Sequence, residues 1–253
     1  MSASPIAVAT ASLTLVGAYL FFLIITAPAA LTFDKLRARI APLTMTDVSG
    51  TFWSGHAGTF SYAALRLTNL EWSVRPFGLL LGRLESGLKL NDSTMHGSGT
   101  LGRTLGGTLY LTDLNGEAEL QALQSSGLLK ILLPVTGQAQ FALRKLRYAD
   151  GKLTAAEGTI EVKNAATLVP QLALGDFHLE LETLQAGIKA TLSDRGGALR
   201  AQGVAMISPD GRYQFTGTFS ARDPNQANLQ QYLRMLGPMG TDGRVSVNNS
   251  GHI

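Results

Sequence analysis

Few residues in this sequence have the types and spacing that chemistry requires. Residues 97–102, Gly-Ser-Gly-Thr-Leu-Gly, match the G-x-G-x-x-G pattern of dinucleotide-binding loops. That pattern binds a pyrophosphate only where a helix follows and directs its N-terminus at the phosphates. Here Gly106, Gly107 and an alternating run at 108–111 follow instead. The sequence therefore predicts a flexible loop or turn at 97–102 that binds no nucleotide.

The other side chains that could react are dispersed. Ser54 lacks a nucleophile elbow, because Phe52 stands where that turn has glycine. The carboxylates fall on polar strand faces or beside turn glycines, where solvation explains them. There is no cysteine, which excludes disulfides and thiolate chemistry. The histidines are far apart and lack the spacing that presents two metal ligands on one helix: His56, His96, His178 and His252. We therefore predict a protein that is not an enzyme, with no catalytic residue, metal or cofactor.

Charge is sparse, and the Lys and Arg residues are scattered. Charged residues make up 15% of the sequence, against about 25% in a typical soluble domain. The formal net charge is +3, and Lys and Arg form no stripe or run of the kind that binds nucleic acid. The composition thus predicts no nucleic-acid partner, and it indicates something other than an ordinary cytosolic surface.

The N-terminal segment carries the least charge. No charged side chain occurs before Asp34, and residues 6–25 have only small or weakly polar interruptions. About 20 apolar residues span a bilayer as a helix. A signal peptide cleaved at 27–29 is the alternative, but residues 1–5 contain no Lys or Arg. We expect a single transmembrane anchor over residues 1–28, whose span includes Ile6, Leu13, Leu20 and Ile25.

The residues after this span leave its orientation open. Lys35, Arg37 and Arg39 follow it closely, and basic flanks prefer the cytoplasmic side. A long following domain can override that preference, so the flank does not decide the orientation. Residues 29–45, with Pro42 near their end, form either a short juxtamembrane helix or a plain linker.

Beyond residue 45 the apolar residues repeat at every second position. Leu70, Trp72 and Val74 alternate with polar residues, which is the pattern of half-buried strands. Turn residues that tolerate positive φ punctuate these runs at Gly106-Gly107, Asp150-Gly151, Gly196-Gly197, Asp210-Gly211 and Asp242-Gly243. We predict one mainly β domain over residues 46–253, built as a long, curved antiparallel sheet.

Three segments depart from this alternation. Its phase shifts between Leu67 and Leu70, so the chain must kink or bulge near Thr68-Asn69. Residues 122–133 do not read as a strand. Residues 225–236 read as a helix, with Asp-Pro before it and Gly-Pro after it. The domain is therefore expected to contain one or two short helices.

The densest aromatic and glycine cluster lies at 49–58, and the two tryptophans of the chain are in or near it. Its prominent residues are Gly50, Phe52, Trp53 and Gly55, together with Trp72 farther along. One interpretation is a strand pair that packs the indoles into the core. The other is a contact surface for another protein, because tryptophan is enriched at interface hot spots. The burial of the two rings distinguishes these interpretations.

Several segments, taken in order, match a known family. They are Val48–Ala57 with its glycine, tryptophan and glycine signature, Leu70–Val74, Leu174–Phe177, Pro209–Tyr213, Ala221–Pro224, the turn Leu236–Pro238 and Gly243-Arg244, all behind an apolar N-terminus. In this order the chain resembles protein N of the bacterial type II secretion system, also called general secretion pathway protein N.

This resemblance implies an inner-membrane protein that crosses once, with its N-terminus in the cytoplasm and residues 46–253 in the periplasm. It implies a non-enzymatic accessory component of the secretion platform, which exports folded proteins from the periplasm across the outer membrane. The implied partners are platform subunits such as protein C, the secretin, and a second copy of the chain. The basic flank fits the implied orientation poorly.

A different function remains open from the residues themselves. A long curved sheet tethered to a membrane can present an apolar concave face, as in lipid-handling proteins of the AsmA-like type. If Phe141, Phe177 and Phe215 line an open trough, contact with lipid is favoured.

Overall fold

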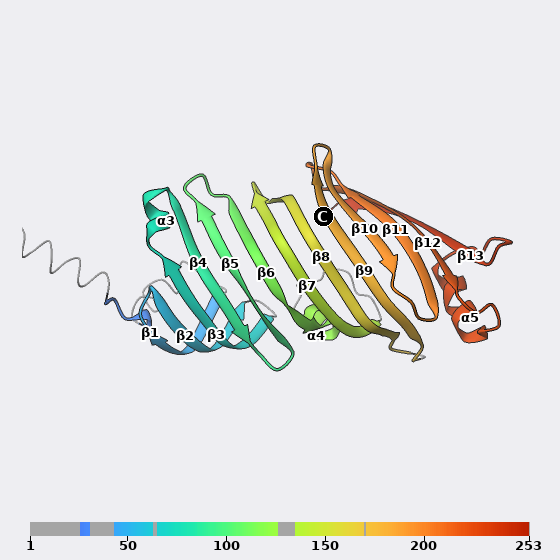
Figure 1. Ribbon diagram of the computed structural model, residues 1–253, viewed down its shortest axis with the longest axis horizontal. Coiled ribbons are helices and arrows are strands. Elements are labelled where there is room, and N and C mark those ends of the chain that lie inside the picture. The colour runs from blue at the N-terminus through green and yellow to red at the C-terminus, as the bar shows by residue number, and fades with distance from the viewer. Residues whose placement is uncertain (1–25, 31–42, 63–64, 126–134, 170, 253) are drawn as a thin grey trace, which may run out of the picture.

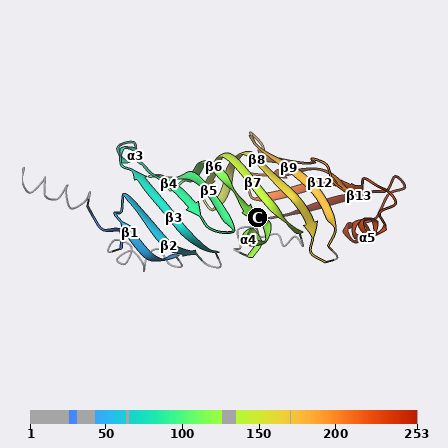
Figure 2. The ribbon, with the colours of Figure 1, turned by 60° about the horizontal axis from the view of Figure 1, so that its bottom comes forward.

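The computed structural model describes residues 26–30, 43–62, 65–125, 135–169 and 171–252. Within these residues, thirteen strands form one antiparallel sheet in which every strand pairs with its neighbours in sequence, from β1 to β13 (Figure 1). Both ends of the sheet turn away from the plane of the central strands β4–β9 (Figures 1 and 2). The predicted mainly β fold with few short helices is confirmed.

The strands range from short edge strands to long central ones. They are β1 Leu43–Gly50, β2 Ser54–Tyr62, β3 Leu65–Arg75, β4 Arg83–Asn91, β5 Met95–Thr104, β6 Leu109–Glu119, β7 Val135–Ala149, β8 Lys152–Thr167, β9 Ala173–Leu184, β10 Gly187–Asp194, β11 Leu199–Ile207, β12 Arg212–Ala221 and β13 Arg244–His252. The helices are α3 Phe77–Leu80, α4 Leu120–Ser125 and α5 Ala227–Leu236.

The turns lie at the glycine pairs that the sequence marks. Between β7 and β8, Asp150 and Gly151 have φ values of 51° and 77°, as a tight hairpin turn requires. Gly106-Gly107, Gly196-Gly197 and Asp210-Gly211 also join consecutive strands. The pair at 242–243 differs, because it leads from α5 into β13 instead of joining two strands.

A crease crosses the first three strands. The pairing of Thr46 with Thr59 and of Thr59 with Thr68 places Asp47, Gly58 and Asn69 in one row. Asp47 and Asn69 have φ values of 54° and 53°, which Asp and Asn tolerate better than most residues. The predicted kink at Thr68-Asn69 is therefore confirmed, and it turns Leu67 and Leu70 toward the same side of the sheet.

The turn between β4 and β5 ties this crease to the next hairpin through Asp92. The Thr68 backbone N–H and hydroxyl donate to one carboxylate oxygen at 2.9 and 2.6 Å. The Thr94 backbone N–H and hydroxyl donate to the other at 3.0 and 2.9 Å. Partial burial acts to raise the pKa of Asp92, but these hydrogen bonds outweigh it and lower the pKa from 3.8 to about 2.

Asp92→Asn is expected to lower the free energy of unfolding at pH 7 by about 1 kcal/mol, a figure reduced for solvent screening. Because the folded pKa is lowered, the carboxylate stabilises the fold above pH 4, and this contribution is lost as the pH falls toward 2. Urea unfolding at several pH values should show the gap between wild type and variant closing over that window. Ser93→Ala in the same turn is the control, and a gap independent of pH would contradict the prediction.

The two faces of the sheet differ in chemistry. Trp72 on β3 lies opposite Leu88 on β4, and both side chains are on the side that we call the apolar face. Glu71 lies opposite Lys89 on the other side, the polar face. The alternation of strand side chains extends this division along the sheet, as the sequence pattern predicts, with breaks at the crease and at bulges between β5 and β9.

Helix α5 covers the apolar face at the C-terminal end of the sheet (Figure 1). Leu229 and Leu233 on the helix are 1% and 0% exposed, and Val245 on β13 is 0% exposed. Phe177 and Phe219 pack against this group. The predicted helix at 225–236 is confirmed and begins at Ala227. A hydrogen bond from the Asn225 N–H to the Asp223 carboxylate precedes it at 2.9 Å.

Several predictions fall on residues that the structure does not describe. The anchor residues Ile6, Leu13, Leu20 and Ile25 lie outside the described residues, as do residues 31–42 and 126–134. No helix within the described ranges has both the length and the apolar character to span a membrane. Strand β1 begins at Leu43 instead of residue 46, and α4 occupies the start of the segment 122–133.

The prediction of a flexible loop at 97–102 is wrong. These residues lie inside β5, paired with β4 on one side and β6 on the other. A Cβ atom on Gly97 would lie 2.6 Å from the backbone oxygen of Asn115, and one on Gly102 would overlap the Tyr110 ring. The glycines therefore serve close packing within the sheet. The sequence alone suggests a loop, because the neighbours that require glycine here lie on another strand and are not adjacent in the chain.

Candidate functional site

The aromatic and glycine motif comes together at the N-terminal end of the sheet. Trp72 is 7% exposed, and its indole N–H donates to the backbone oxygen of Phe52 at 3.1 Å. Ala29 and Ala57, both 0% exposed, pack with it. We call Trp72, Ala29 and Ala57 the Trp72 cluster. The burial of this ring shows that Trp72 is a core residue.

The two glycines of the motif make room for the ring and for the turn. Gly55 on β2 lies opposite Trp72 in the ladder, and a Cβ atom there would overlap the indole. Gly50 has a φ of 87°, and its Cβ atom would lie 2.6 Å from the Ser54 oxygen. Both positions therefore require glycine for structural reasons.

The residues between β1 and β2 form a closed turn. The Thr51 N–H donates to the Ser54 oxygen at 2.8 Å, and the Ser54 N–H donates to the Thr51 hydroxyl at 3.1 Å. The Val74 N–H donates to the Trp53 oxygen at 2.6 Å, which ties this turn to β3. Ser54, the first residue of β2, thus closes this turn.

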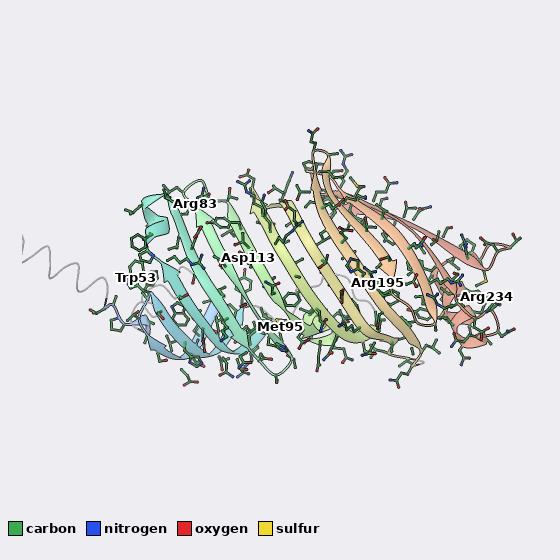
Figure 3. The ribbon with its side chains drawn as sticks, in the orientation of Figure 1. Trp53, Arg83, Met95, Asp113, Arg195 and Arg234 are labelled. Carbon is green, nitrogen blue, oxygen red and sulfur yellow. The ribbon has the colours of Figure 1, made fainter. Side chains whose placement is uncertain are left out.

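The ring of Trp53 lies at the edge of this region. It meets the Phe52 ring edge to face, with 5.3 Å between the centroids and 86° between the planes. Both side chains are half-buried. Figure 3 shows Trp53 at the N-terminal end of the sheet, far from Arg195 and Arg234 in the C-terminal half. Trp53, unlike Trp72, retains surface that another protein could contact.

The same turn holds the segment that precedes the domain. The Phe52 N–H donates to the Ala27 oxygen at 3.0 Å, and Pro28 pairs with Thr51 as an isolated bridge. Ala29 then enters the Trp72 cluster. The motif therefore fixes residues 27–29 to the first three strands, so that the N-terminal segment meets the sheet at a defined place.

The histidines are not brought together. His96 meets Glu117 at 2.6 Å on the polar face, and the Gln140 amide donates to the same carboxylate at 3.1 Å. The hydrogen bond from Gln140, followed by the charge of His96, lowers the pKa of Glu117. Within the described ranges, no three histidine or carboxylate side chains cluster in a way that could hold a metal ion.

An apolar groove crosses the first seven strands, on the same face as Trp72. Its volume is about 520 Å³, and Phe52, Trp72, Leu88, Leu101, Leu111 and Phe141 are among its lining residues. Of the three phenylalanines that test for a trough, Phe141 lines the groove, whereas Phe177 packs in the core beneath α5. The Phe215 ring lies 6.5 Å from that of Phe219 in the same C-terminal half. Of these three phenylalanines, only Phe141 lines the groove, which crosses the N-terminal half of the sheet.

Comparison with protein families shows to which family the chain belongs. The family model described as "Type II secretion system (T2SS), protein N" matches residues 41–248, which include β1 and most of β13. The chain belongs to the type II secretion system protein N family. The resemblance drawn from the motif order is thereby confirmed, and the Trp72 cluster lies almost wholly within the matched region of this protein N family member.

Curated members of the protein N family resemble the chain over nearly their whole length. Type II secretion system protein N of Aeromonas hydrophila is 28% identical over 241 residues, covering 93% of this chain and 95% of the relative. The Klebsiella pneumoniae protein of the same name is 28% identical over 249 residues, with 93% and 92% covered. The Vibrio cholerae protein is 24% identical over 218 residues, with 83% and 85% covered. No solved structure matches the chain.

Proposed function

We propose that the chain is a non-enzymatic accessory component of the inner-membrane platform of the type II secretion system, where it supports export of folded proteins from the periplasm. The observation that carries this proposal is the family match along nearly the whole sheet, from residue 41 to residue 248. A match of that extent concerns the architecture of the domain and not a single motif.

The proposed topology is a single-pass protein with a cytoplasmic N-terminus. Residues 1–28 anchor it, and residues 46–253 lie in the periplasm. The apolar run at 6–25 and the attachment of residues 27–29 to the sheet support a domain held close to the bilayer. The basic residues Lys35, Arg37 and Arg39 oppose this orientation.

A reporter fused after residue 253 tests the orientation. Alkaline phosphatase, which is active only outside the cytoplasm, is expected to be active in this fusion, and β-galactosidase to be inactive. The reverse pattern would overturn the periplasmic location, because it would show that the basic flank decides the orientation.

Two surfaces are proposed for contacts with partners, among them platform subunits such as protein C, the secretin and a second copy of the chain. The half-buried Trp53 offers an aromatic contact on the turn between β1 and β2. In the part of the chain that the structure describes, β1 and β13 each pair with one strand only, and residues 239–240 bridge the other edge of β13 at Arg244 and Val245 alone. Such edges can accept a strand from another chain.

Deleting the gene is expected to leave secreted enzymes in the periplasm, with a several-fold loss from the medium, because the platform would lack one of its components. Fractionation of the culture followed by enzyme assay measures this. Complementation with the wild-type gene should restore secretion, whereas Trp53→Ala should restore it less well at equal protein level. Normal secretion by the deletion strain would contradict the proposed function.

A further inference from the structure

The glycines of the segment 97–102 form the floor of the apolar groove. Gly97 and Gly99 lie at apolar-face positions of β5, opposite Leu90 and Leu88 of β4. On the other side, Gly97 pairs with Gly116 of β6. The Phe141 ring lies beside Gly116, so it is Gly97 and Gly99 that lack side chains where β4 carries leucine. This absence of side chains hollows the sheet surface.

The walls of the groove are large apolar side chains that water reaches. Leu84, Leu101 and Leu109 line it and are 41%, 39% and 41% exposed. Exposed apolar surface costs about 25 cal/mol per Å², so leucines gathered in a groove indicate a surface that is covered in use. At the C-terminal end of the same face α5 packs over Leu174, Leu199 and Val245, but no described helix residue lines the groove.

The lining chemistry favours one class of occupant. A polypeptide brings backbone N–H and C=O groups that must find partners when buried. Most side chains that line this groove are apolar and provide none, and the polar exceptions are Ser86, His96, Ser98 and Arg103. A hydrocarbon chain needs no such partners, and each CH₂ group that it buries strengthens its binding.

We propose that the groove binds the acyl chain of a membrane lipid across the Gly97–Gly99 floor. The position of the groove indicates that the lipid comes from the adjoining membrane. Phe52 and Trp72 line the groove, and they also belong to the region that fixes residues 27–29. The apolar run at 6–25 ends just before those residues. The groove therefore begins where the chain leaves the bilayer. This inference goes beyond the proposed secretion function and rests on the proposed anchor only for the source of the lipid.

Site-specific photocrosslinking in the full-length protein tests the proposal. A benzophenone amino acid at Leu111 lies in the groove, and one at Thr112 lies on the polar face of the same strand. In membranes whose phospholipids carry radioactive phosphate, illumination should label the Leu111 protein several-fold more than the Thr112 protein. Equal labelling of the two, or crosslinks from Leu111 only to protein, would overturn the proposal.

A second variant shows whether the label depends on the groove itself. Leu101→Glu places a charge beside Leu111, its partner in the ladder, and should reduce the Leu111 label several-fold. Thr100→Glu, on the polar face, should leave the label unchanged. Circular dichroism spectra and melting temperatures establish that both variants fold. An unchanged label in a folded Leu101→Glu protein would count against the groove.

Carbonate extraction of the same membranes distinguishes failure of the proposed anchor from failure of the proposed lipid-binding groove. If carbonate releases the chain, but the purified protein still labels preferentially at Leu111 with phospholipid vesicles, the anchor fails and the groove stands. If the chain resists carbonate and Leu111 labels no better than Thr112, the groove fails while the anchor stands.

Discussion

Trp72→Ala is expected to lower the free energy of unfolding of the full-length protein in mild detergent by about 3–5 kcal/mol. The ring is 7% exposed, fills the space above Gly55 and packs against Ala29 and Ala57. Its removal leaves a cavity, and it also leaves the Phe52 oxygen without the indole donor. Urea unfolding followed by circular dichroism measures the loss.

Trp53→Ala is the matched control, because its ring is half-buried and lies at the surface of the turn. Its cost should be about 1 kcal/mol, as for most substitutions outside the core. Trp72→Ala should also expose residues 27–29 to proteolysis, since the cluster holds Ala29. Equal losses for the two tryptophans would show that Trp72 is not the core residue described above.

Leu233→Ala is expected to cost about 3 kcal/mol, the second large effect. Leu233 is 0% exposed and packs with Leu229 and Val245 between α5 and the last strand. Met235, on the opposite side of the same helix, is 74% exposed, so Met235→Ala should change stability little. Thermal unfolding of the two variants beside the wild type measures both effects.

The outcome also tests whether α5 is part of the core. If Leu233→Ala were as stable as Met235→Ala, the helix would contribute little to covering the apolar face. Hydrogen exchange of β12 and β13 would then be independent of Leu233. In Leu233→Ala, hydrogen exchange of β12 and β13 is expected to speed up relative to the wild type, because these strands lose packing with the helix. The increase should be larger than in β5 and β6.

Much of the fold follows from local patterns in the sequence. Alternation at Leu70, Trp72 and Val74 specifies a strand with one apolar face, and the pair Asp150-Gly151 specifies a hairpin turn. The break in phase before Leu70 predicts the kink at Asn69. These features succeed because each depends only on residues close together in the chain.

The features that were missed depend on residues far apart in the chain. Gly97 and Gly102 look like loop residues until the strand pairing places Asn115 and Tyr110 beside them. The short helix α3 at Phe77–Leu80 gives no periodic signal, because it has a single turn. The fixing of Ala27 by Phe52 was not predicted either, because it joins a segment expected to be in the anchor to a hairpin turn.

The strictly sequential strand order has a consequence for biogenesis. Each strand pairs with the one before it and the one after it, so no early strand waits for a partner made much later. Most connections between paired strands are short, apart from those that contain α4 and α5, and short closures favour fast folding. The sheet can thus grow strand by strand in the direction of synthesis, and while the chain is still emerging its two edges are β1 and the newest strand.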